Sequence, residues 1–116
     1  MLSLGDIMAE QSIQSLLQNA PQVFMAERAE GVNVVVHFHL TCEQGGDWGM
    51  TIKDQRCLVT HGVPANPSLT LTADAKNALG VLTGKIDGVR AFMMGKLKLT
   101  GDFKLAMKLT SFFKFN

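Results

Sequence analysis

The chain has no tyrosine, one tryptophan and only two cysteines among its 116 residues. Charged residues are also scarce, at 18% of the composition, whereas hydrophobic residues reach 47%. This composition argues against a disordered chain, because so many apolar residues bury enough surface to offset the entropy lost on folding. A chain of this length has room for one hydrophobic core, so we expect a single domain over residues 1–116.

The sequence also lacks the features that would send it into or across a membrane. It contains no apolar run of the ~18 to 20 residues that a bilayer-spanning helix needs. No basic residue precedes Arg28, so the amino terminus does not have the charged start of a secretion signal. We therefore expect a cytoplasmic protein, in which Cys42 and Cys57 stay reduced.

Charge is low overall but uneven along the chain. The formal net charge is only +1, which argues against nucleic acid as a partner. From Lys85 onward, however, seven basic residues stand against the two acidic residues Asp87 and Asp102. The seven are Lys85, Arg90, Lys96, Lys98, Lys104, Lys108 and Lys114. This end is either an ordinary solvated face or a surface that makes transient contact with an anionic membrane.

Motifs for catalysis are absent as well. The chain has neither a G-x-S-x-G nucleophile elbow nor a glycine-rich phosphate loop. His37 and His39 have the spacing by which a strand presents two imidazoles to zinc, but a third ligand would have to come from His61 or a cysteine. Cys42 falls on the opposite face of that strand. Two solvent-facing histidines are the simpler interpretation, so we expect no enzyme activity, no metal and no cofactor.

Hydrophobic periodicity predicts a mixed order of helices and strands. Positions 32–42 alternate between apolar and polar residues, which is typical of a strand with one wet face. The Gly45-Gly46 pair predicts a hairpin to the next strand, and the type of the following turn at Asp54-Gln55 stays open. The expected order is helix 1–20, helix 23–30, strands 32–42, 48–53, 56–61 and 68–72, a helix from Asp74 to Gly84, a helix from Asp87 to Gly95, strand 96–100 and helix 102–113.

Apolar side chains are in surplus near the carboxyl end. The stripe on helix 102–113 covers more than half of its circumference, so a neighbouring helix, a partner subunit or a bound apolar ligand must cover the remainder. Seven Met and seven Phe without Tyr suit an adaptable apolar cavity, although ordinary core packing competes for each residue. Our candidates for the wall of a lipid cavity are Trp48, Met50, Phe92, Met93, Phe103, Met107, Leu109, Phe112 and Phe113.

One motif resembles a known family. The spacing of Gly84, Lys85, Ala91, Phe92, Gly95, Lys96, Leu97, Gly101 and Asp102, together with Gly45, Gly46 and Trp48, is similar to the sterol carrier protein 2 (SCP2) lipid-binding domain. The resemblance covers nearly the whole chain. It implies an α+β fold, with a five-stranded mixed sheet and about five helices packed on one face around a hydrophobic tunnel. The Gly45-Gly46-Asp47-Trp48 pattern favours a free-standing prokaryotic member.

Three functions follow from these observations. The first is binding and carrying a lipid or fatty-acid ligand, such as a fatty acyl chain, an acyl-CoA, an isoprenoid or a sterol-like molecule. The second is an accessory or scaffold subunit that assists a lipid-metabolising enzyme, or forms a homodimer, through its carboxyl-terminal apolar stripe. The third, for which the sequence offers least, is an enzyme that uses His37 and His39 on a metal.

Overall fold

Five strands form one mixed sheet in the computed structural model, which describes residues 13–41 and 46–114. The part of the predicted amino-terminal helix that precedes Ile13 lies outside the described residues. Cys42 and Gly45 lie outside them as well. Strand order is β3-β2-β1-β4-β5, with β1 and β4 parallel and the other neighbours antiparallel. The strands are β1 Val34–Thr41, β2 Gly46–Lys53, β3 Arg56–His61, β4 Leu69–Asp74 and β5 Leu97–Gly101.

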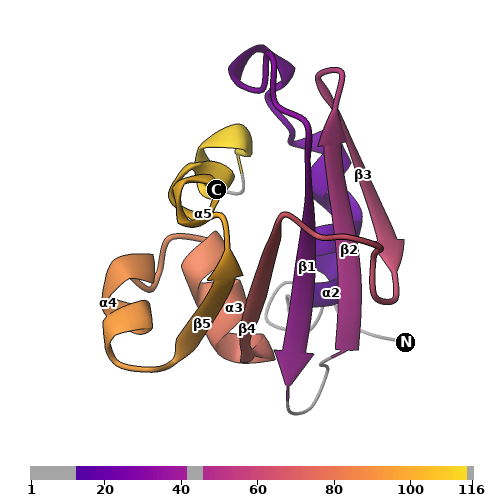
Figure 1. Cartoon of the computed structure of the whole chain (residues 1–116). Helices are drawn as coiled ribbons and strands as arrows, with labels where there is room; N and C mark the ends of the chain where they lie inside the picture. The colour runs from indigo at the N-terminus through magenta and orange to yellow at the C-terminus, as the bar shows by residue number, and fades with distance from the viewer. Residues whose placement is uncertain (1–12, 42–45, 115–116) are drawn as a thin grey trace, which may run out of the picture.

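Short helices gather on one face of this sheet (Figure 1). The described residues contain the α-helices α2 Ile13–Asn19, α3 Ala75–Leu82, α4 Gly88–Met93 and α5 Phe103–Leu109, and the 3-10 turns η1 Ala20–Gln22, η2 Ala26–Arg28 and η3 Thr110–Phe112. None of these helices combines the length and the apolar character that crossing a bilayer requires. The predicted α+β fold with a five-stranded mixed sheet is confirmed.

Alternation along the strands decides which face is buried. The even-numbered residues of β1 from Val36 to Leu40 are buried, and Trp48, Met50 and Ile52 of β2 continue the same face. His37 and His39 point to the opposite face, because successive side chains of a strand alternate. The helices cover the apolar face, so the sheet has a helix-covered face and an open face.

The connection between β3 and β4 crosses the open face of the sheet (Figure 1). Pro64 of this connection lies over Gly49, where an added Cβ would stand 3.1 Å from the Cβ of Pro64. At its far end, the N–H of Ser68 donates to the carbonyl of Val35 at 2.7 Å, and the N–H of Val35 donates to Oγ of Ser68 at 3.2 Å. These contacts carry the chain from the β3 edge across to β4, beside β1.

Aspartates begin three of the helices, as the sequence predicts. The Asp74 carboxylate accepts from the N–H of Lys76 at 2.7 Å, and Asp87 and Asp102 cap α4 and α5 in the same way. The turn left open by the sequence has φ values of +52° at Asp54 and +59° at Gln55. Positive φ at both central residues is typical of a type I′ turn, so the hairpin between β2 and β3 uses a primed turn without glycine.

Two predicted helices are shorter than expected, for one shared reason. Phe24 forms a β-bridge with Phe113, the N–H of Met25 donates to the carbonyl of Phe112 at 2.7 Å, and the N–H of Lys114 donates to Val23 at 3.0 Å. This pairing holds the backbone near Phe24 extended, so the predicted helix 23–30 is reduced to η2. It also ends the predicted helix 102–113 early, with α5 stopping at Leu109 and η3 following.

Candidate functional site

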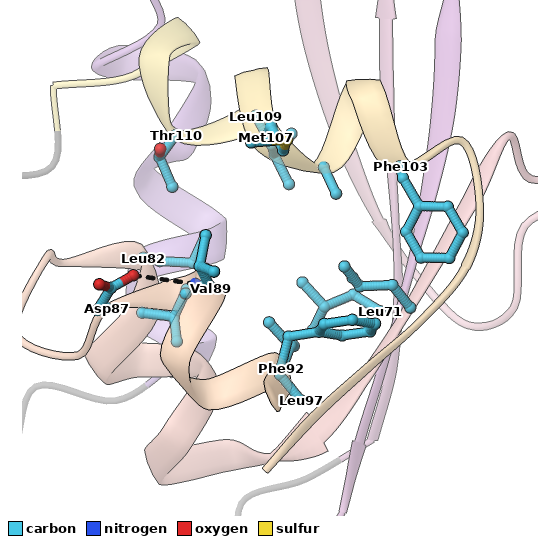
Figure 2. Close-up of a pocket in the computed structure, with 14 residues that line it drawn as sticks. Leu71, Leu82, Asp87, Val89, Phe92, Leu97, Phe103, Met107, Leu109 and Thr110 are labelled. Carbon is cyan, nitrogen blue, oxygen red and sulfur yellow. Dashed lines mark hydrogen bonds between the residues drawn. The ribbon is translucent and has the colours of Figure 1, made fainter. Parts of the chain in front are cut away.

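A cavity of about 390 Å³ lies between α4 and α5, above β4 and β5 (Figure 2). Its volume falls in the range of about 300–1,000 Å³ that is typical of small-molecule sites. The lining residues come from six elements and the loop before α4, and most of them are apolar. They are Leu71, Val81, Leu82, Asp87, Gly88, Val89, Phe92, Leu97, Leu99, Phe103, Ala106, Met107, Leu109 and Thr110.

The floor and the walls of the cavity have different origins. Leu71 of β4 and Leu97 of β5 form the floor, because both lie on the buried side of the sheet. The two residues are diagonal neighbours in the antiparallel pairing of these strands. The helices supply the walls: Figure 2 shows Met107 of α5 across the cavity from Val89 of α4. The cavity is therefore a gap between two short helices that the sheet closes from below.

The cavity opens to solvent between the two helices. Val89, Phe92, Phe103 and Met107 are 56%, 43%, 53% and 75% exposed, although all four are large and apolar. The rings of Phe92 and Phe103 meet edge to face across the opening, with their centroids 6.1 Å apart. A group of exposed apolar side chains around one cavity is typical of a binding site, because it leaves apolar surface in water until a ligand covers it.

Polar groups are few in the lining, and they have structural roles. Of the residues that the structure describes, Asp87 is the only ionisable one in the lining, and its carboxylate accepts the N–H of Val89 at 3.0 Å as the cap of α4. Within the described ranges, no histidine, cysteine or serine lines the cavity. Basic residues stand just outside it: Arg90, Lys104 and Lys108 are exposed, and each follows a lining residue directly in the sequence. The lining therefore offers an almost wholly apolar surface.

The structure brings four of the nine sequence-predicted wall residues together at this cavity. Phe92, Phe103, Met107 and Leu109 line it, whereas Met93, from the same helix as Phe92, is 79% exposed and is not among the lining residues.

The other four predicted wall residues lie in the core. Trp48 and Met50 are buried under the helix-covered face of β2, and Trp48 contacts the ring of His61 with centroids 4.0 Å apart. Phe112 and Phe113 are buried at the pairing with the segment around Phe24, where the rings of Phe24 and Phe113 lie 5.4 Å apart. A role of any of the nine residues in lipid binding stays a prediction.

Seven apolar lining residues escaped the sequence-based prediction. These are Leu71, Val81, Leu82, Val89, Leu97, Leu99 and Ala106. The alternation of β4 and β5 already places Leu71, Leu97 and Leu99 on the face that the helices cover. That signal identifies a residue as covered, but it does not distinguish a residue under a helix from one under a cavity.

Fold and cavity together define an α+β domain with an apolar chamber between its sheet and the helices α3, α4 and α5. Residues 13–114 match the SCP-2 sterol transfer family, and the chain belongs to that family. A curated relative, hydroxysteroid dehydrogenase-like protein 2 of Rattus norvegicus, is 32% identical over 84 residues, which are 72% of this chain and 16% of the relative. The chain therefore corresponds to a small part of that longer protein.

Solved structures support the fold. The sec-alkylsulfatase Pisa1 from Pseudomonas sp. superposes with a TM-score of 0.78 at 14% identity, over 86% of this chain and 16% of the sulfatase. Palmitated SCP2L2 from Aedes aegypti superposes with a TM-score of 0.66 at 23% identity, over 87% of this chain and 93% of that protein. At these identities the likeness extends to the fold alone.

Proposed function

We propose that this domain binds lipids by enclosing an apolar chain in the cavity between α4 and α5. The observation that carries the proposal is the cavity itself, which is almost wholly apolar and opens between exposed side chains such as Phe92 and Phe103. Each methylene moved out of water contributes about 0.8 kcal/mol, so a long acyl chain offers on the order of 10 kcal/mol before ordering costs. That free energy is sufficient for micromolar binding without specific polar contacts.

The ligand class follows from the chemistry of the wall. Fatty acyl chains, acyl-CoA, isoprenoids and sterol-like molecules all offer the apolar surface that the cavity covers, and the palmitated state of the Aedes aegypti protein supports the first of these. Met107 and the exposed rings at the opening adapt to different shapes, which favours loose selectivity. Carriage without catalysis is part of the proposal, and it is supported by the lining, which among residues 13–41 and 46–114 contains no histidine, cysteine or serine and only one ionisable group.

The binding test uses one cavity-filling variant and one matched control. Ala106 lines the cavity, so Ala106→Trp places an indole in the space of the ligand. Ala65 lies exposed in the connection between β3 and β4, so Ala65→Trp adds the same group elsewhere. We expect Ala106→Trp to weaken uptake of a fluorescent fatty acid at least tenfold, about 1.4 kcal/mol, and Ala65→Trp to leave it unchanged. Equal binding by both variants, or no uptake by the unmodified chain, contradicts the proposal.

Transient contact with an anionic membrane forms the second part of the proposal. The exposed apolar side chains at the opening stand beside the basic residues Arg90, Lys104 and Lys108, and a basic residue near an anionic surface contributes about 1 kcal/mol. We expect Lys104→Glu with Lys108→Glu to reduce binding to phosphatidylglycerol vesicles at least tenfold. Lys53→Glu with Lys76→Glu makes the same change in net charge on exposed residues outside the cavity and should have a much smaller effect. Similar losses in both pairs contradict this part.

A second candidate function is an accessory or scaffold subunit for a lipid-metabolising enzyme. Met93 and Met94 favour it, because both are exposed large apolar residues that do not line the cavity. Light scattering tests self-association: a mass that rises with concentration and falls back in Met93→Gln supports a homodimer or a partner surface. A monomeric mass at all concentrations removes the homodimer.

Several expectations from the sequence remain predictions. These are the absence of enzyme activity, the cytoplasmic location, and a free-standing prokaryotic protein that consists of one domain over residues 1–116.

A further inference from the structure

Three side chains with metal-binding atoms meet on the open face of the sheet, away from the lipid cavity. Nε2 of His37 lies 2.8 Å from Oδ1 of Asp47, and Nδ1 of His39 lies 2.7 Å from the same oxygen. One ligand atom from each of the three residues falls within 4.8 Å of the other two. Two imidazole nitrogens and a carboxylate oxygen are therefore already gathered at one point.

The register of the first hairpin explains this convergence. His39 stands directly opposite Asp47 in the antiparallel pairing of β1 with β2, and His37 stands opposite Gly49. Gly49 has no side chain, so the ring of His37 leans diagonally toward Asp47. Asp47 lies two positions from Gly49 on the neighbouring strand, a distance that a long side chain spans. β1 is paired on both sides, with β2 and with β4, so the framework that holds the histidines is rigid.

We propose that His37, His39 and Asp47 bind a divalent transition-metal ion such as Zn²⁺, each through one ligand atom. Imidazole nitrogen and carboxylate oxygen are usual zinc ligands, and three protein ligands leave at least one coordination position for water or for a group from another molecule. That position faces solvent, because the side chains of His39 and Asp47 are 49% and 32% exposed. The site is independent of the proposed lipid binding.

Little movement is needed for an ion to enter. Without metal, the one carboxylate oxygen accepts hydrogen bonds from both rings. Zinc bonds to nitrogen and oxygen are about 2.0–2.2 Å long, which sets tetrahedral ligand atoms about 3.3 Å apart. The two nitrogen–oxygen separations therefore lengthen by about 0.5 Å, a change that side-chain rotation supplies while the β-ladder stays intact.

The other ligand candidates that the sequence suggested within the described residues lie elsewhere. His61 contacts Trp48 on the helix-covered side of the sheet, and Cys57 packs against the core on that same side. Burial raises the pKa of the Cys57 thiol to about 12, so this residue stays protonated at neutral pH and does not bind zinc well. Asp47 supplies the third ligand that the spacing of His37 and His39 lacked.

The test measures zinc binding to the full chain after metal removal by a chelator. Competition with a chromophoric chelator and elemental analysis give affinity and stoichiometry, and Co²⁺ serves as a spectroscopic probe of the ligands. We expect one Zn²⁺ per chain and at least tenfold weaker binding in Asp47→Asn and in His39→Gln. His61→Gln removes the remaining histidine and is the matched control, with unchanged affinity.

A second measurement uses the unmodified chain, so it does not depend on whether a variant folds. In the unmodified chain, Zn²⁺ should shift the imidazole NMR signals of His37 and His39 and leave those of His61 in place. Absence of zinc binding in the unmodified chain overturns the proposal. So does binding that survives both Asp47→Asn and His39→Gln in folded protein, or that His61→Gln abolishes. Lipid uptake measured on the same samples should not depend on zinc, so failure of one proposal is distinguishable from failure of the other.

Discussion

The helix-covered face of the sheet has two halves, β1–β3 and β4–β5, which contain similar apolar residues but are packed differently. On the β1–β3 side, Phe38, Trp48 and Met50 are almost fully buried between the sheet and the chain before β1. On the β4–β5 side, Phe103 and Met107 remain largely exposed around a cavity. Phenylalanine and methionine therefore serve as core in one region and as a reserve of uncovered apolar surface in the other. The difference lies in what covers them.

The lengths of the helices account for this contrast. α4 has six residues and α5 has seven, so neither makes more than two turns over β4 and β5. Only Ala91 of α4, and Leu105 with Leu109 of α5, are buried. Short helices that bury so few residues leave space between them, and this space is the cavity.

The largest expected effect separates the two regions by stability. Phe38 is fully buried in the central strand, so Phe38→Ala should lower the free energy of unfolding by about 3–5 kcal/mol. Phe103→Ala makes the same change at the cavity and should cost less than about 1 kcal/mol, because half of that side chain is already in water. Urea denaturation of both variants provides the comparison. Equal losses would mean that the β4–β5 side is packed as tightly as the β1–β3 side.

A glycine at the end of β5 ties the cavity side to the rest of the sheet. Gly101 has φ of +107°, and an added Cβ would overlap the carbonyl oxygen of Ser68. Gly101→Ala should therefore destabilise the chain by about 2 kcal/mol or more. Gly95 has φ of +77° in open space, so Gly95→Ala isolates the backbone strain and should cost about 1 kcal/mol. Thermal unfolding measures both, and a larger loss in Gly95→Ala would contradict this view of Gly101.

Hydrogen exchange should show the contrast without any substitution. We expect amides of α4 and α5 to exchange faster than those of β1 and β2, because fewer buried contacts oppose their opening. A bound fatty acid at 100 times its Kd stabilises the domain by about 2.7 kcal/mol, and protection should rise mainly in α4 and α5. Mass spectrometry of peptic fragments resolves the two regions. A rise confined to β1 and β2 would move the ligand to the other side of the sheet.

The smallest expected effect concerns the single tryptophan. Trp48 is buried beside His61 and does not line the cavity, so lipid uptake should not shift its emission maximum. A tryptophan introduced by Phe103→Trp, in a chain that also carries Trp48→Phe, should shift to shorter wavelength as ligand replaces water at the opening. Fluorescence titration with a fatty acid distinguishes the two positions. A large shift from Trp48 alone would place the ligand near β2.

Local signals predicted most of the fold. Apolar and polar residues alternate strictly around Phe38 and Met50, so the buried face of β1 and β2 could be predicted from period alone. Asp74, Asp87 and Asp102 each precede a helix and cap it through their own side chains, a signal that involves only neighbouring residues. These features need no knowledge of the tertiary structure.

The cavity could be predicted only in part, because it depends on distances between elements. Phe103 and Phe112 belong to the same carboxyl-terminal apolar stripe, yet Phe112 is covered and Phe103 is not. The segment around Phe24 covers the end of the chain, and no pattern within residues 102–113 reveals that pairing. Sequence therefore identified the surplus of apolar residues but not the position of the gap.

Asp47 escaped prediction for a different reason. Its partners His37 and His39 were singled out by their spacing, but Asp47 falls beside the predicted turn, where acidic residues are common and have no special meaning. The register of the hairpin places it opposite His39. A two-residue turn at Gly45-Gly46 would instead set Gln44 opposite Asp47, so the turn expected from the sequence did not predict the contact with His39.

The parallel pairing of β1 with β4 also imposes an order on folding. β4 pairs with β1, although strands β2 and β3 lie between the two in the chain. Antiparallel neighbours joined by short turns form early because little loop entropy is lost, whereas the long closure that brings β4 to β1 comes later. We therefore expect the cavity between α4 and α5 to be completed last, after the meander of β1, β2 and β3 has formed.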